Sequence, residues 1–184
     1  IRNRVLFVIA MLAVFRFLAT IPVPGVDANS LSQAFTNNQF LSLFNAVSGG
    51  GLSTFSIVML GVGPYITATI IMQLLTMLSP KLKAMYQEEG QAGRMKFAQY
   101  SRMLTIPLAL IQAFSFLTIL QQQSIIDPLS TFDLIRNISI ITAGSVFLMW
   151  IGERISEFGI GNGTSLIIFA GIIAALPPAV QQAV

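Results

Sequence analysis

The sequence predicts an all-α polytopic membrane protein, and three observations lead to this fold class. Hydrophobic residues make up 54% of the 184 residues and charged residues only 9%, against a charged share of about 25% in typical globular proteins. Five apolar stretches follow one another along the chain. The basic residues gather in alternate connections between these stretches. A chain with so few charges cannot cover a water-facing surface, which argues against a soluble monomer.

The five apolar stretches are the expected membrane spans. A helix needs about 20 apolar residues to cross a bilayer core about 30 Å thick. The second and third stretches meet this requirement and carry no charge, whereas the other three gain length only from flanking polar turns. We therefore expect spans at about residues 5–21, 55–78, 103–120, 134–151 and 164–180.

The charges of the connections predict the orientation. Lys and Arg flank the N-terminus, occupy the segment 79–102 and follow the fourth span, while the connections 22–54 and 121–133 contain neither. The positive-inside rule places the N-terminus and a loop at 79–102 in the cytosol and the end of the chain outside. An odd number of spans, in a chain that starts with Ile1 instead of Met, suggests half of a larger bundle. The basic loop has a second, compatible interpretation as a docking face for an acidic cytosolic partner.

Most catalytic chemistry is excluded by composition. The chain has no Cys and no His, which removes thiol nucleophiles, His-based triads and nearly every zinc site. Glu153 and Glu157 are better explained as a solvated helix end beside Arg154 than as a carboxylate pair. The glycine run 159–163 lacks the lysine of a phosphate-binding loop, and Asn162 is more simply a helix N-cap. We expect no enzymatic activity, no cofactor and no metal.

The first external connection ends in an apolar, glycine-rich piece at about residues 44–53. Three consecutive glycines, 49–51, would break a spanning helix. The alternative is a flexible linker, but linkers seldom carry this much Phe, Val and Leu. We favour a packed re-entrant segment, which requires a cavity beneath it, because non-helical backbone at membrane depth survives only beside protein or water.

Two spans carry a polar stripe. On the second span the stripe covers an arc of about 80° and changes from aliphatic to polar toward the cytosol; its members are Val62, Ile66, Thr69, Gln73 and Thr76. On the third span Ser101, Thr105 and Gln112 share an arc of about 40°. Taken alone, such stripes are best explained by hydrogen bonds between helices. The sequence Gly61-Val62-Gly63-Pro64 predicts a bend or restart of the second helix.

Eight motifs in a fixed order resemble a known family. They are Ile21-Pro22-Val23-Pro24-Gly25-Val26-Asp27, Ser48-Gly49-Gly50, Leu60-Gly61-Val62-Gly63-Pro64-Tyr65-Ile66, Met72-Gln73-Leu74-Leu75, Gln99-Tyr100-Ser101-Arg102, Phe147-Leu148-Met149-Trp150-Ile151-Gly152-Glu153, Gly159-Ile160-Gly161-Asn162-Gly163 and Leu176-Pro177-Pro178. From about Arg2 to Val180 the chain closely resembles the first half of the SecY family of translocase channel subunits, in its bacterial or plastid form.

The resemblance implies a fold and a set of site residues. The family fold has ten helices in two inverted halves of five, and the five expected spans fit the first half. The implied pore ring is Val62, Ile66 and Ile168. The implied external plug includes Phe44, Ser48, Gly49, Gly50, Gly51 and Leu52. The implied lateral gate, which would meet the signal peptide, contains Gln73, Thr76 and Gln112.

The resemblance also implies a function and partners. The expected activity is passage of unfolded secretory polypeptides across the membrane, with lateral release of hydrophobic segments into lipid. The expected partners are SecE and SecG-type subunits, the SecA motor ATPase, the ribosome and signal peptides, without sequence-specific binding of nucleic acid. The expected location is the bacterial plasma (inner) membrane, or the thylakoid membrane for a plastid protein. Two alternatives remain: half of a secondary transporter, although no intramembrane acid is evident to couple an ion, and an integral membrane enzyme.

Overall fold

Helices make up most of the described chain. The computed structural model describes residues 2–24, 55–87, 90–122 and 126–183, with side chains up to residue 174. The helices are α1 (Arg2–Ala19), α4 (Gly63–Leu78), α5 (Pro80–Gln87), α6 (Gly90–Gln122), α7 (Thr131–Phe158) and α8 (Gly163–Ala183). An isolated antiparallel bridge between Pro22 and Ser56 is the only extended pairing within these described ranges. The predicted all-α class is confirmed.

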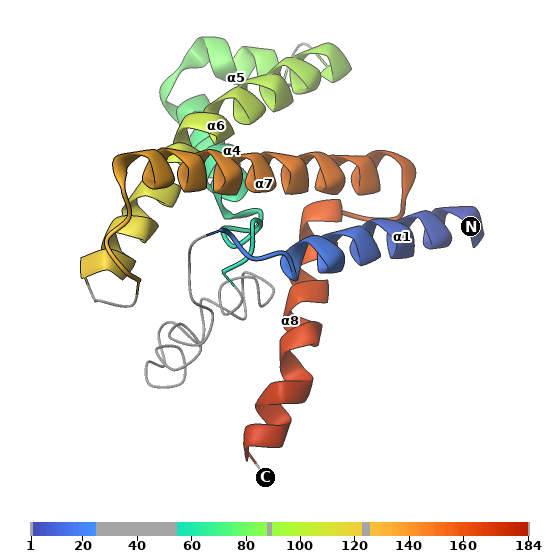
Figure 1. Ribbon diagram of the computed structural model, residues 1–184. Coiled ribbons are helices and arrows are strands. Elements are labelled where there is room, and N and C mark those ends of the chain that lie inside the picture. Colours follow the sequence, from blue (N-terminus) through green and yellow to red (C-terminus); the bar gives the residue numbers. More distant parts are fainter. Residues whose placement is uncertain (1, 25–54, 88–89, 123–125, 184) are drawn as a thin grey trace.

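Helix α7 is the centre of the arrangement (Figure 1). It contacts α1, α4, α6 and α8. Helix α1 runs alongside α7, whereas α8 points away from both, and α5 lies with the first part of α6 on the other side of α7. Helices α4 and α6 form the most extensive helix pair and are joined at one end through α5.

The apolar helices differ in length. Helices α6 and α7 are long and apolar enough to cross a membrane. The apolar helix α4 and the apolar part of α8, Gly163–Ala174, are shorter, and α1 carries three arginines. Five spans therefore stay a prediction, with two clear spans in the part of the chain that the structure describes.

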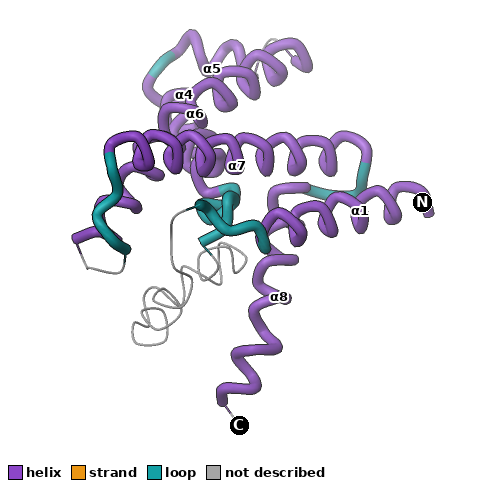
Figure 2. Tube along the Cα trace, viewed as in Figure 1, coloured by secondary structure: helices purple, strands orange, loops and turns teal. Residues whose placement is uncertain are grey.

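The stretch expected as a span at 55–78 is helical only from Gly63 onward. Residues 55–62 form successive turns, closed by hydrogen bonds from Met59 N to Ser56 O (2.9 Å) and from Gly61 N to Val58 O (2.8 Å), and Figure 2 draws this segment as loop and turn. Gly61 has φ +59°, and Pro64 lies in the first turn of α4. The predicted bend or restart at Gly61–Pro64 proves to be the start of the helix, because turns and not a first helical segment precede it.

The non-helical start of this stretch has a tertiary cause. Val23 N donates to Phe55 O (2.8 Å) and Ile57 N donates to Ile21 O (3.0 Å). These hydrogen bonds use backbone groups that a helix would otherwise pair internally. Residues 55–62 therefore form a bridge and turns, although their side chains are compatible with a helix. By contrast, the segment expected as a cytosolic loop at 79–102 is mostly helical, because α5 fills its first part and α6 already begins at Gly90.

Two buried clusters lie at successive levels of α7. The first, here called the outer cluster, joins the segment before α4 to α6 and α7, and contains Val23, Phe55, Met59, Ala113, Leu117, Leu120, Ile126 and Ile141. The second, here called the α7 cluster, joins α1, the start of α4, α7 and α8, and contains Phe15, Ala19, Val58, Val62, Leu148, Ile151, Ile155 and Ile167. A smaller cluster of Met72, Met85 and Phe97 joins α4, α5 and α6.

Candidate functional site

The three residues expected in the pore ring gather at the α7 cluster. Val62, at the N-terminal cap of α4, is 5% exposed and is a member of this cluster. Ile66, in the first turns of α4, and Ile168, on α8, are partly buried and pack against it. The structure thus brings aliphatic side chains from two helices distant in sequence to one apolar centre on α7.

A close backbone contact holds the segment before α4 against α7. Gly144 of α7 lies so near the Ile57 carbonyl that a Cβ at position 144 would stand 1.9 Å from its oxygen. Only glycine fits at this contact without a shift of one backbone. Because Val58 follows Ile57 directly and Val62 comes four residues later, the contact also sets where the start of α4 meets the α7 cluster.

A second close contact joins α7 to the start of α8. A Cβ at Gly163 would stand 1.9 Å from the Gly152 carbonyl oxygen. The Ser156 hydroxyl donates to that same carbonyl (3.0 Å) and accepts from Gly163 N (2.8 Å). Asn162 Oδ1 accepts from Ser165 N (3.2 Å), so the predicted N-cap role of Asn162 is confirmed.

The residues expected in the lateral gate fall into two places. Gln73 is exposed and Thr76 is half-buried on α4, in the part of α4 where Met72 packs with Phe97. Gln112 is half-buried on α6, next to Ala113 of the outer cluster. The structure therefore places Gln73 and Thr76 about one turn apart on α4. Gln112 lies about four turns along α6 from Phe97, the residue that packs with Met72.

The hydroxyls of the polar stripes bond within their own helices. On α4, Thr69 donates to Tyr65 O (3.0 Å) and Thr76 donates to Gln73 O (2.6 Å). On α6, the buried Thr105 donates to Ser101 O (2.7 Å). The interpretation of these hydroxyls as links between helices is wrong, because each is satisfied by a carbonyl of its own helix.

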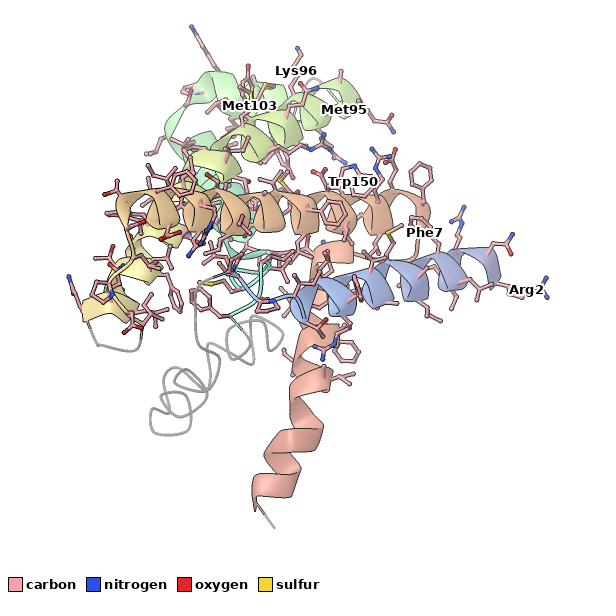
Figure 3. The ribbon with its side chains drawn as sticks, viewed as in Figure 1. Arg2, Phe7, Met95, Lys96, Met103 and Trp150 are labelled. Carbon is pink, nitrogen blue, oxygen red and sulfur yellow. The ribbon has the colours of Figure 1, made fainter. Side chains whose placement is uncertain are left out.

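Charged side chains tie the helices at the opposite end from the outer cluster. Arg102 of α6 forms an ion pair with Glu153 of α7, and Arg154 pairs with Glu157 within α7 (2.9 Å). The two glutamates thus each face an arginine, which agrees with a helix end and not with a carboxylate pair. Near the same end, Phe7 of α1, labelled in Figure 3, meets Phe158 of α7 edge to face, with ring centroids 6.2 Å apart.

Comparison with known proteins decides the family. Residues 56–184 match the family model described as SecY. The chain belongs to the SecY family. Among curated relatives, the protein translocase subunit SecY of Buchnera aphidicola subsp. Acyrthosiphon kondoi is 46% identical over all of this chain and 53% of its own length. That of Escherichia coli strain K12 is 45% identical over all of this chain and 43% of its own length. The chain thus spans about half the length of these SecY relatives.

Solved structures show the same fold. The SecY family chain matches a structure titled Sec61 in the canine ribosome-channel complex from the endoplasmic reticulum, with a TM-score of 0.63, 21% identity and coverage of 91% of this chain and 35% of that chain. It also matches a structure titled as a protein conducting channel, with a TM-score of 0.62, 22% identity and the same coverages. At these identities the likeness is one of fold.

The plug expected in this SecY family chain lies outside the described residues. This applies to Phe44, Ser48, Gly49, Gly50, Gly51 and Leu52. The described residues on either side of segment 25–54 are joined by the Pro22–Ser56 bridge. Arg136 of α7 also holds the first of these ends, because its Nη2 donates to Pro24 O (3.3 Å) while it pairs with Asp133 (3.0 Å).

Sequence reasoning missed three residues that shape the site. Gly144, Ser156 and Gly163 bring the start of α4 and the start of α8 onto α7. A glycine within a predicted span, such as Gly144, was a usable signal for close helix approach. Nothing in the local pattern distinguishes Ser156 from other serines, because its partner lies on the next helix.

Proposed function

We propose that the chain is the N-terminal half of the central pore-forming subunit of the general protein translocase. In this function the subunit passes unfolded secretory polypeptides across the membrane and releases hydrophobic segments sideways into lipid. The observation that carries the proposal is the 45–46% identity to translocase subunits over the whole chain. The convergence of Val62, Ile66 and Ile168 on one apolar centre supports it.

The ring of Val62, Ile66 and Ile168 is proposed to be the seal. Aliphatic side chains offer an ion no polar partner, so a narrow constriction made of them gates by excluding water. Their contacts are weak one by one and have no preferred direction. A polypeptide can therefore displace them and the ring can close again behind it, without the loss of any specific bond.

The plug and the lateral gate complete the proposed channel. The plug would be the segment at about 44–53, in which three glycines place few restraints on the backbone. The lateral gate would be lined by Gln73, Thr76 and Gln112, facing the other half of the channel. A signal peptide at this gate would divide between channel and lipid according to its hydrophobicity.

The proposed setting follows from the family and the charges. The chain would be a multi-pass protein of the bacterial plasma (inner) membrane, or of the thylakoid membrane if it comes from a plastid, with its N-terminus in the cytosol. It would assemble with SecE and SecG-type subunits and receive substrates from the SecA motor ATPase or the ribosome. The proposed role includes no enzymatic activity, because the energy for transport would come from these partners.

The proposed pore is testable by crosslinking, because the chain has no Cys. In the full-length protein, freed of any other Cys, Ile66→Cys is combined with a secretory polypeptide stalled in transit that carries one Cys. The control is Leu75→Cys, which lies about 180° around the same helix α4 and is 37% exposed. Disulfides that form at position 66 only with the stalled substrate, and not at position 75, are expected. Equal reactivity at the two positions would contradict the pore.

A further inference from the structure

The start of α8 is held by a side chain from another helix. The first four N–H groups of a helix have no partner within it and need one from outside. For α8, Asn162 supplies the partner of Ser165 N. The N–H of Gly163 instead donates to the hydroxyl of Ser156, seven residues earlier on α7, at 2.8 Å.

The same hydroxyl is bonded on its other side to α7. Ser156 Oγ donates to the Gly152 carbonyl at 3.0 Å, so one oxygen links the backbone of α7 to the first residue of α8. The two backbones approach closely here, because a Cβ at Gly163 would stand 1.9 Å from the Gly152 oxygen and 2.8 Å from the Cβ of Ile155. This arrangement of Gly152, Ser156 and Gly163 is here called the α7–α8 joint.

The joint lies close to the proposed ring. Ile167 of α8 is 2% exposed and belongs to the α7 cluster with Ile151 and Ile155, and Ile168 packs against that cluster. Ile168 follows Gly163 by five residues, about 7.5 Å along the helix axis. Because α8 otherwise points away from α7 (Figure 1), a change of direction at the joint would move Ile168 relative to Val62 and Ile66.

We infer that Ser156 is a positioning residue that fixes the start of α8 and thereby holds Ile168 in the ring. The inference rests on the proposed function. It means that a polar side chain on α7 sets the position of one aliphatic side chain of the seal. Ser156 acts through the backbone, because its hydroxyl bonds to the Gly152 carbonyl and to the Gly163 N–H. Its role is to keep the direction of α8 constant while the ring opens and closes.

The test measures resting ion conductance of the complete channel in planar bilayers. Ser156→Ala removes both hydrogen bonds of the joint without adding bulk. Ser156→Thr keeps the hydroxyl and should restore the seal. Ser139→Ala is the matched control, since Ser139 donates to Ile135 O within α7 (2.8 Å) and not to another helix. Ile168→Asn places a polar group in the ring itself.

The expected result is a leak from Ser156→Ala about five-fold above the wild type, the factor that follows from loss of the one hydrogen bond that joins α8 to α7. Ser156→Thr and Ser139→Ala should stay sealed, and Ile168→Asn should leak. If Ile168→Asn leaks while Ser156→Ala stays sealed, the positioning role is overturned and the proposed ring stands. If Ile168→Asn stays sealed, the ring itself is contradicted. A leak shared by Ser139→Ala, or one that Ser156→Thr does not relieve, also overturns the positioning role.

A measurement on the unaltered channel covers the case in which Ser156→Ala fails to accumulate. The Gly163 N–H has no acceptor within α8, so its protection from hydrogen exchange reports on the bond to Ser156. Slow exchange at Gly163 is expected. Exchange at the rate of a free amide in the native channel would show that the joint does not hold, and would overturn the inference.

Discussion

The two ends of α4 are built differently. At its start, Val62 lies inside the α7 cluster and Ile66 packs against it, and the preceding segment is fastened by backbone hydrogen bonds to residues 21–23. At the other end, Gln73 and many of its neighbours are exposed. There α4, α5 and α6 border an open apolar groove of about 450 Å³, lined by Met72, Leu75, Leu82, Tyr100, Met103, Leu104 and Pro107; Met103 is labelled in Figure 3.

The N-terminal end of α4 is here called the fixed end, and its C-terminal end the loose end. The start of α4 is held on α7 by a close backbone contact at Gly144 and by buried apolar side chains. The loose end carries exposed apolar side chains, such as Leu74, Met77 and Leu78, and segments with few buried side chains are typical of elements that move. The proposed seal residues of α4 thus lie at the end that is packed firmly against α7. The proposed gate residues of α4 lie toward the exposed end, which can change its packing partners.

The largest effect is expected at the fixed end. Ile66→Asn should raise the resting ion conductance of the complete channel by a factor on the order of ten, because an amide in the constriction gives water and ions a polar partner. Thr76→Asn, which replaces a polar side chain at the loose end, should leave the conductance unchanged. Planar-bilayer recordings of the two variants provide the comparison. Equal conductance in both would remove the distinction between the two ends.

The next effect concerns the contact that holds the fixed end. Gly144→Ala would place a Cβ 1.9 Å from the Ile57 oxygen, so the segment before α4 must shift at a cost of about 1–3 kcal/mol in the free energy of unfolding. The control is Gly63→Ala, where a Cβ would meet nothing within 4 Å. Thermal unfolding of the purified complete channel should show a lower Tm for Gly144→Ala alone. The same Tm for both variants would mean that the Gly144 contact does not fix this end.

A smaller effect is expected at the ion pair that ties α6 to α7. Arg102 is 47% exposed and Glu153 is 18% exposed at their side chains, so solvent screens the pair and limits it to about 0.2–1 kcal/mol. A double-mutant cycle with Arg102→Gln and Glu153→Gln should return a coupling free energy in this range that falls as salt rises. Glu157→Gln, combined with Arg102→Gln, is the uncoupled control. A salt-independent coupling would point to a contact other than charge.

The long apolar helices could be predicted from sequence because their signals are local, whereas α5 and the first part of α6 lie in the segment 79–102 that was expected as a loop. Long apolar runs indicated α6 and α7, and Gly61 with Pro64 indicated the break at which α4 begins. The segment from Phe55 to Leu60 could not be predicted as turns. Its residues suit a helix, and the bonds that prevent one come from residues 21–23, which no local pattern contains.

The candidate site was predictable only in part, for the same reason. Val62 and Ile66 share a helix face, so their proximity follows from spacing, whereas Ile168 entered only through the resemblance to the SecY family. The contacts at Gly144 and Ser156 could not be predicted from spacing. They hold the starts of α4 and α8, which carry the ring residues, against α7. Gln112 entered the proposed gate through the same resemblance, because a polar stripe on α6 gives a place on that helix alone.

The smallest effect on stability, and the most specific effect on function, is expected at the loose end. Gln73 is exposed, so Gln73→Leu should change the free energy of unfolding by less than about 0.5 kcal/mol. In the proposed gate, however, this substitution would remove a polar group that disfavours closure against the other half of the channel. Export of a substrate with a weakly hydrophobic signal peptide should fall about three-fold, equivalent to about 0.6 kcal/mol, while a strongly hydrophobic signal is unaffected.

The matched control for this variant is Gln99→Leu, an exposed glutamine of α6 in the basic connecting segment. Pulse-labelled export of the two substrates separates the roles of these positions. If Gln99→Leu lowers export as much as Gln73→Leu, the loss of any exposed glutamine suffices and the loose end of α4 has no special part in the gate. If only Gln73→Leu discriminates between the signals, one helix carries the seal at its fixed end and the selection of hydrophobic segments at its loose end.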